Sequence, residues 1–123
     1  MQRDIVERSF EFASKIVAFI PLLRHTDEGR LIGKQLLRSG TSIGANVEEA
    51  ESGSSKDDFI YKMNLALREA RETHYWLRLI KKTNLAMAVQ LDNLIKEADE
   101  LRRILGAIVS SSRGRRKQKV LRG

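Results

Sequence analysis

Few side chains in this chain of 123 residues could carry out catalysis, because it has two histidines and no cysteine. A di-iron site in a helical bundle needs Glu-x-x-His motifs, yet the residue three positions before His74 is Arg71. A serine hydrolase needs a histidine that an acid orients, and no such pattern stands out. We therefore expect no catalytic, metal-binding or cofactor-binding residue, no enzyme activity, and a packed, hydrogen-bonded role for His74.

Basic residues surround a tyrosine at spacings of three and four between positions 68 and 82. On a helix these spacings form one column, which we call the basic column: Arg68, Arg71, Tyr75, Arg78 and Lys82. Its cations could follow a phosphate backbone while the ring stacks on a base. The alternative is a solvated face paired with Glu69, Glu72 or the acidic cluster Glu48, Glu49 and Glu51, and the sequence leaves both interpretations open.

A second basic group lies at the C-terminus. Residues 113–123 carry six cations and no anion: Arg113, Arg115, Arg116, Lys117, Lys119 and Arg122. Most of the net charge of +7 therefore belongs to this segment, and the rest of the chain is close to neutral. We predict a disordered basic tail over 113–123, following a folded domain over 1–112. Such a tail attracts polyanions, and the alternative is a merely solubilising end.

Four segments must position these groups. Apolar residues recur in them at steps of three and four, which predicts helices over residues 3–20, 27–52, 56–82 and 85–111. Pro21 ends the first helix, and residues that cap helix N-termini precede the others: Thr26 or Asp27, Ser55, and Asn84. Four helices with short links predict an all-α, up-down-up-down antiparallel four-helix bundle.

Small residues weaken the second helix. Gly40 and Gly44 flank Ser42, and each glycine costs roughly 0.5–1 kcal/mol relative to alanine inside a helix. A close contact with a neighbouring helix would offset that cost, and the alternative is a loop from Gly40 to Gly44. Asn46 is expected to bond a neighbouring backbone group.

The third helix has two apolar sides. Besides its main stripe, it carries four apolar residues on roughly the opposite side: Tyr61, Leu65, Trp76 and Leu79. An edge helix of a monomer would have polar residues there. We therefore predict that these four residues form an oligomer interface.

The lack of cysteine fits a reducing compartment. The first twenty residues are amphipathic rather than uniformly apolar, and no stretch is long enough to span a bilayer. We expect a soluble, cytoplasmic protein with no membrane partner.

A family resemblance rests on two neighbouring segments, QLLRSGTSIGANVEEA (35–50) and DDFIYKMNLALREARETHYWL (57–77). They resemble the bacterial four-helix-bundle proteins encoded in intervening sequences of 23S ribosomal RNA genes. The likeness extends to ADELRRIL (98–105) and so covers nearly the whole chain.

The wider superfamily includes the accessory variability proteins of diversity-generating retroelements. These resemble barrel-shaped homopentamers that bind nucleic acid and a reverse transcriptase. The resemblance implies a homopentamer, and together with the basic residues it favours a non-catalytic nucleic-acid-binding protein, with RNA as the favoured partner. The alternative is a structural or adaptor oligomer whose partner is a protein such as a reverse transcriptase.

Overall fold

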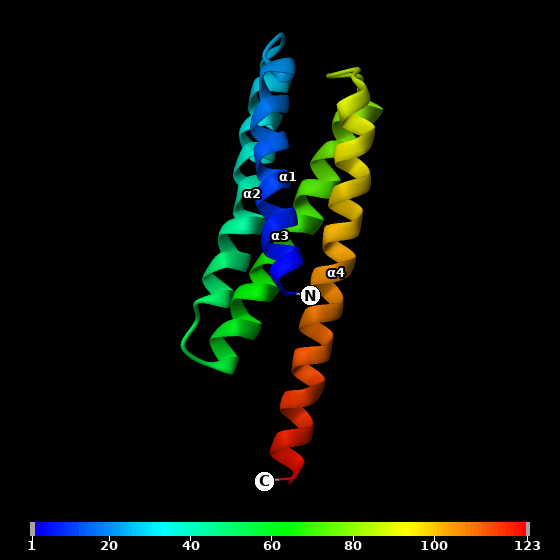
Figure 1. Cartoon of the computed structure of the whole chain (residues 1–123). Coiled ribbons are helices and arrows are strands. Elements are labelled where there is room, and N and C mark those ends of the chain that lie inside the picture. Colours follow the sequence, from blue (N-terminus) through cyan, green and yellow to red (C-terminus); the bar gives the residue numbers. More distant parts are fainter. Residues whose placement is uncertain (1, 123) are drawn as a thin grey trace.

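The computed structural model describes the backbone of residues 2–122 and the side chains of residues 4–115, 117, 118, 120 and 121. Over these residues the chain is all-α, with four long helices and one short 3-10 helix: α1 (Gln2–Phe19), η1 (Ile20–Leu23), α2 (Asp27–Glu51), α3 (Lys56–Lys82) and α4 (Val89–Arg122). Each long helix packs against the next one along the chain, as in an up-and-down bundle (Figure 1). The predicted fold class is therefore confirmed for the single chain.

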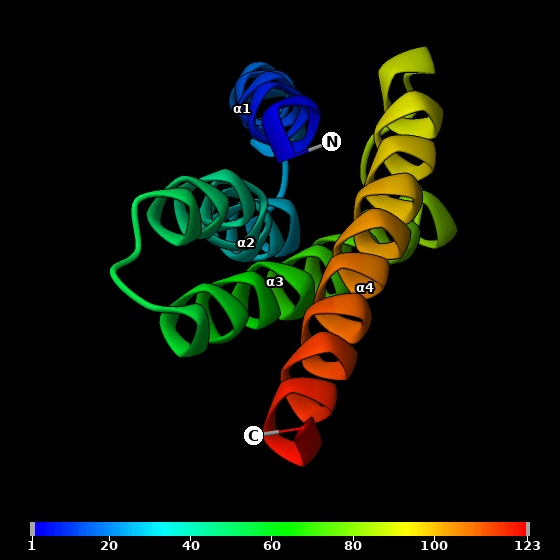
Figure 2. The same ribbon diagram turned by 60° about the horizontal axis from the view of Figure 1, so that its bottom comes forward.

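The core runs along the bundle, and α3 is its central helix. The largest fully buried side chains come from every helix: Ile5, Phe12, Ile16, Leu23, Leu36, Ile43, Met63, Leu77, Ile80, Leu101 and Leu105. Helix α3 packs extensively against both α2 and α4, whereas α1 and α4 make far fewer contacts and diverge (Figure 2). One side of α3 remains uncovered by the other helices.

Helices α1 and α2 approach closely where α2 carries glycine. A Cβ atom at Gly40 would lie 2.9 Å from Cγ1 of Ile16, and one at Gly44 would lie 3.2 Å from the carbonyl oxygen of Ser9. Helix α2 continues without a break through both glycines, which excludes a loop there. Close helix packing is thus the reason for small residues in this segment.

Local hydrogen bonds confirm several of the predicted ends and contacts. Thr26 Oγ1 accepts from the backbone N–H of Gly29 at 2.9 Å, which caps α2. Ser55 Oγ accepts from the N–H of Asp58 at 3.1 Å, which caps α3. Asn46 also behaves as expected, because its Nδ2 donates to the carbonyl oxygen one turn earlier in α2 at 2.9 Å.

The link between α3 and α4 differs from the prediction. Asn84 has a φ of 57°, and the N–H of Leu85 donates to the carbonyl oxygen of Ile80 at 3.2 Å. This is a Schellman motif, which ends α3 rather than starting α4. Helix α4 begins at Val89 and not at Leu85 as predicted, so Met87 lies exposed in the link.

The C-terminal segment also differs from the prediction. Helix α4 continues through residues 113–122, where we expected a disordered tail, and it projects beyond the other helices (Figure 1). This segment has no proline, has Gly114 as its one glycine, and consists largely of strong helix formers. Arg115 donates to Ser111 Oγ, one turn earlier, at 2.6 Å. Composition predicted disorder here, but a helix already under way needs only good propensity to continue.

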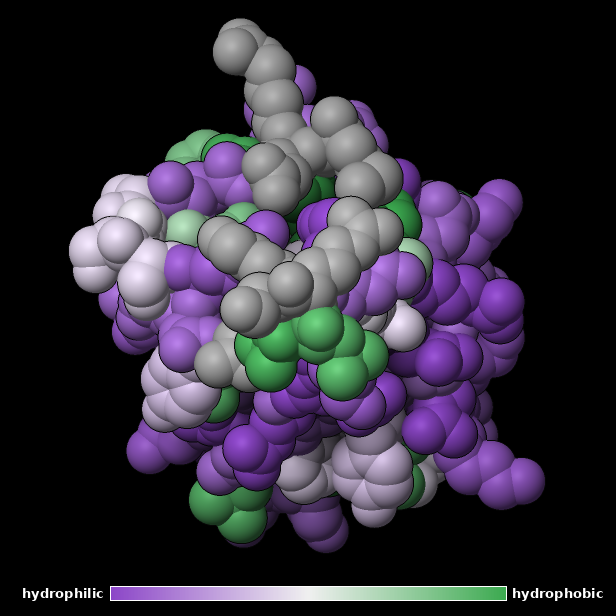
Figure 3. Space-filling model, turned by 90° about the horizontal axis from the view of Figure 1, so that it is seen from below, coloured by the Kyte–Doolittle hydropathy of each residue, from purple (hydrophilic) through white to green (hydrophobic). Residues whose placement is uncertain are grey.

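The end of the molecule from which α4 projects is largely hydrophilic, with small, separate hydrophobic patches (Figure 3). From residue 113 onward, every side chain that the structure describes is exposed.

Candidate functional site

The acids of α3 are engaged by α2. Arg38 pairs with Glu69 at 3.1 Å and also with Glu72. The indole N–H of Trp76 donates to Glu72 Oε2 at 3.0 Å. Burial alone would raise the pKa of Glu72, but the hydrogen bonds from Trp76 and Arg38 lower it below its ordinary value. Both acids are therefore held by Arg38 and not by the cations of α3.

The basic column lies on the uncovered side of α3. All four of its cations are exposed, and no acidic side chain in the described part of the chain pairs with them: Arg68, Arg71, Arg78 and Lys82. Tyr75 is 50% exposed, and its ring meets that of Trp76 edge-on, with centroids 5.2 Å apart. The column is thus an open row of cations around an accessible ring.

The acidic cluster does not neutralise this column. Glu49 pairs with Lys62 Nζ at 3.0 Å, a residue outside the column, while Glu48 and Glu51 are exposed. In the residues that the structure describes, no three histidine, cysteine, aspartate or glutamate side chains gather as metal ligands.

The predicted oligomer interface adjoins the column. Tyr61 is 60% exposed, whereas the other three members are half-buried: Leu65, Trp76 and Leu79. Trp76 packs against the core of its own subunit, which accounts for part of its burial. At 100° per residue, Tyr61 and Leu79 each lie about 20° from Arg68 around the helix. The apolar and basic residues therefore share the outward side of α3.

The C-terminal cations lie along the projecting end of α4. Arg113, Arg115 and Lys117 are exposed on this helix. The side chains of Arg116, Lys119 and Arg122 lie outside the described residues. Where the structure describes them, these cations are arrayed on a helix and not on a flexible arm.

Sequence reasoning missed a charged cluster between α3 and α4. His74 is half-buried as expected, but its Nε2 lies 3.9 Å from Asp99 Oδ1, beyond hydrogen-bond distance. Asp99 is paired with Arg102 at 2.5 Å and Arg103 at 3.0 Å. The sequence signal was an aspartate followed by arginines three and four residues later, which predicts ion pairs on one helix but not their position opposite His74.

The same cluster lowers the pKa values of both His74 and Asp99. Burial lowers the pKa of His74, Arg78 and Arg102 lower it further, and Asp99 opposes them. Burial alone would raise the pKa of Asp99, but hydrogen bonds from Arg102 and Arg103 lower it. His74 is therefore neutral and Asp99 ionised at neutral pH.

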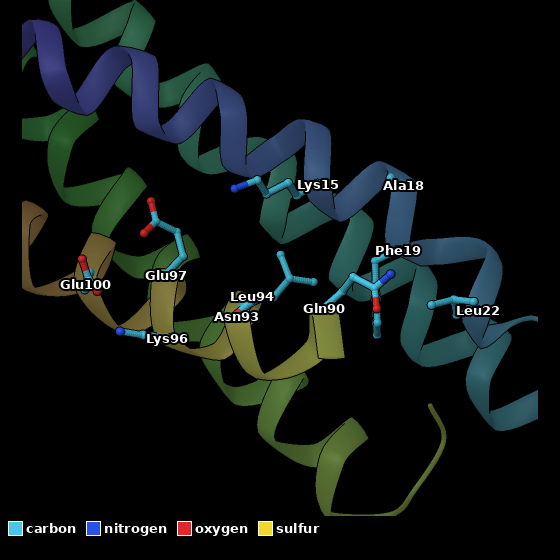
Figure 4. Close-up of a pocket in the computed structure, with 10 residues that line it drawn as sticks. All are labelled: Lys15, Ala18, Phe19, Leu22, Gln90, Asn93, Leu94, Lys96, Glu97 and Glu100. Atoms are coloured by element: carbon cyan, nitrogen blue, oxygen red, sulfur yellow. The ribbon is translucent and has the colours of Figure 1, made fainter. Parts of the chain in front are cut away.

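A cavity of about 570 Å³ lies between the end of α1 and the start of α4 (Figure 4). Phe19, Leu22 and Leu94 give it an apolar part. Its acids, Glu97 and Glu100, pair with Arg8 at 2.8 and 2.9 Å. No histidine or serine lines it, so this cavity offers no nucleophile with a base beside it.

No helix in the described part of the chain is long and apolar enough to cross a membrane.

Comparison with known proteins adds two findings. The family model described as 23S rRNA-intervening sequence protein matches residues 1–107. A crystal structure of a protein of unknown function from the S23 ribosomal protein family of Bacteroides thetaiotaomicron is similar, with 41% sequence identity and a TM-score of 0.79. The similarity covers 85% of this chain and 97% of that chain. No curated protein matches. The family match ends within α4, before the C-terminal basic segment.

Proposed function

This chain belongs to the 23S rRNA-intervening sequence protein family, and we propose that it is a non-catalytic, homo-oligomeric protein that binds nucleic acid, preferably RNA. The observation that carries this proposal is the open basic column of α3. Its acidic neighbours Glu69 and Glu72 are held by Arg38, which leaves the cations of the column available to an external anion.

The column has the dimensions and chemistry of a phosphate-backbone contact. From Arg68 to Lys82 it extends about 21 Å, at 1.5 Å per residue. Phosphates that displace solvent counterions there would supply affinity without sequence preference. Tyr75, exposed at the middle of the column, offers a ring on which an unpaired base can stack. Unpaired bases are the usual targets of RNA-binding proteins, which favours RNA and, with it, the cytoplasm as the place of action.

A homopentamer is the proposed assembly. The family resemblance implies it, and the apolar residues beside the column support an interface on α3, because they lie on one side of this helix and none is fully buried in the single chain. The interface would consist of Tyr61, Leu65, Trp76 and Leu79. Symmetry would then place a basic column at each subunit boundary, so one nucleic acid could contact several columns at once.

The second candidate is an adaptor oligomer that binds a protein, such as a reverse transcriptase, and has no direct contact with nucleic acid. The observation that favours it is the cavity between α1 and α4. Its apolar part could receive a side chain of a partner protein. In this case the basic residues would serve solubility only.

A gel-shift titration against structured RNA at two salt concentrations separates the candidates. Nucleic-acid binding predicts tight binding that weakens steeply with salt, whereas the adaptor predicts no shift. The variant Arg71→Glu with Arg78→Glu should abolish the shift. Arg24→Glu with Lys34→Glu is the control, because both residues are exposed, neither belongs to α3, and together they change the net charge equally. Loss of binding in both variants would mean that net charge, and not the column, governs binding.

A further inference from the structure

The contact between α3 and α4 has a fixed register. Three pairs of facing residues are spaced by seven positions on both helices, in opposite directions: Lys81 with Asp92, His74 with Asp99, and Leu67 with Gly106. The helices are therefore antiparallel, and the same register sets Arg71 level with Arg102. Arg71 lies one turn from His74 along α3 and is exposed.

Positive charge exceeds negative charge around His74. The guanidinium groups of Arg102 and Arg103 both pair with one carboxylate, that of Asp99. Arg71 and Arg78 on α3 have no acidic partner in the described part of the chain. The two guanidinium groups that act on His74, those of Arg78 and Arg102, are therefore opposed by one carboxylate, which Arg103 also shares. The Nε of Arg102 is buried and has no hydrogen-bond acceptor, so the fold does not satisfy this arginine fully.

His74 lies at the centre of this cluster. The charged groups acting on it are Arg78 from its own helix and Asp99 and Arg102 from α4. Burial and the two arginines lower its pKa, while Asp99, already shared by two arginines, opposes them only in part. An anion bound beside these arginines would offset their charge and favour the imidazolium form. The bound anion and the proton on His74 would then stabilise each other.

We propose that the contact between α3 and α4 around His74 is a seat for one phosphate group of the nucleic-acid backbone, held by Arg71, Arg78 and Arg103, in which His74 takes up a proton as the phosphate binds. The identity of the ligand rests on the proposed function. The seat adds α4 residues to the basic column and makes binding depend on pH. Binding tightens as the pH falls toward the histidine range.

The size of this effect follows from linkage. Where the free imidazole is neutral and the bound one is protonated, each unit of falling pH tightens binding up to about tenfold per occupied seat. Above the pKa values of both the free and the bound imidazole, His74 is neutral in both states, and its protonation no longer makes the affinity change with pH. His25 is exposed in the link before α2 and far from this contact in sequence, so it serves as an internal control.

The test follows the imidazole Cε1–H signals of both histidines by NMR as the pH falls from about 7.5 to about 5.5, the range in which histidine titrates. The wild-type protein is titrated alone, with inorganic phosphate, and with a short structured RNA. We expect the RNA to raise the pKa of His74. In parallel gel shifts, the wild type and His25→Gln should bind more tightly at the lower pH, and His74→Gln should lose most of this gain.

The outcomes separate the seat from the function. RNA that binds without moving the His74 titration overturns the seat and leaves the proposed function standing. A second outcome is that RNA does not bind at either pH but inorganic phosphate raises the pKa of His74. This result overturns the proposed function and the assignment of the ligand as a nucleic-acid phosphate, and it leaves a site for free phosphate. No response to either ligand overturns both proposals. The NMR experiment uses wild-type protein, so none of these outcomes depends on the folding of a variant.

Discussion

Gly44 of α2 lies directly against the backbone of Ser9 in α1, so that a Cβ atom at Gly44 would sit 3.2 Å from the Ser9 carbonyl oxygen. Backbone cannot rotate away as a side chain can. Gly44→Leu should therefore overpack this contact and lower the free energy of unfolding by about 1–3 kcal/mol. Thermal or urea unfolding followed by circular dichroism measures the loss.

Gly114→Leu is the matched control for that substitution. Gly114 also lies in a helix, but a Cβ atom there would meet no atom within 4 Å. The same side chain should leave the melting temperature unchanged or raise it slightly, because leucine has the better helix propensity. Equal melting temperatures for wild type and Gly44→Leu would contradict a packing role for the small residues.

Tyr61 tests the assembly more cleanly than Trp76. Trp76 packs on the core of its own subunit and donates to Glu72, so a charge there would also unfold the monomer. Tyr61 is 60% exposed in the single chain, and Tyr61→Glu should spare the fold. If α3 forms the interface, the new charge would be desolvated on association. Light scattering should then show a smaller particle than the wild type at micromolar concentration.

Leu31→Glu is the control for assembly, because Leu31 is 67% exposed on α2 and lies outside the proposed interface. It should leave the particle size unchanged. A wild-type protein that is already monomeric at micromolar concentration would rule out the homopentamer.

His74 should make stability fall in weakly acidic solution. Burial and the neighbouring Arg78 and Arg102 lower its pKa in the folded state, so the unfolded chain binds the proton more readily. Stability is therefore full above the unfolded value of about 6.5 and is lost as the pH falls toward the lower folded value. Urea unfolding at about pH 7.5 and 5.5 should show a smaller loss for His74→Gln than for wild type.

His25→Gln should retain the wild-type loss of stability, because His25 is exposed. If His74→Gln and wild type lose equal stability between the two pH values, His74 does not titrate as its surroundings indicate. The carboxylates, whose ordinary pKa values are lower, contribute mainly below this range.

Helix bounds were predictable where side chains cap them. Serine favours the N-cap and not the left-handed position after a helix, so Ser55 indicated only the start of a helix. Helix α3 begins at Lys56 as expected. Asn84 was ambiguous, because asparagine suits both a helix N-cap and the left-handed residue after a helix. The choice depended on a hydrogen bond from Leu85 back to Ile80, which spacing along the chain does not reveal.

The basic column was predictable because all its members lie on one helix, where spacing alone sets their direction. The pairing of Arg38 with Glu69 and Glu72 was not, since it joins two helices whose relative register the sequence leaves open. The same limit hid the position of Asp99 opposite His74. Side chains on one helix can be placed from sequence, whereas contacts between helices need the packed structure.

The salt dependence of binding separates the basic column from the C-terminal end of α4. Each phosphate neutralised contributes about −0.7 to the slope of log affinity against log salt on a single strand, and about −0.9 on duplex DNA. If two or three C-terminal cations engage phosphates, ending the chain after Ser112 should flatten that slope by roughly two units per engaged subunit. The truncated protein should still fold, because the exposed residues beyond Ser112 contribute little to the core.

We expect both regions to contribute, with the column fixing the position of the nucleic acid. Truncation should then weaken binding and flatten the slope, while Arg71→Glu with Arg78→Glu should abolish binding in a folded protein. Gel shifts over a series of salt concentrations, starting at about 50 mM where the phosphate contribution is strong, measure both effects. A truncated protein with an unchanged slope would confine binding to the column. A full-length protein that shows no salt-dependent binding to structured RNA or duplex DNA would contradict nucleic-acid binding and favour the adaptor.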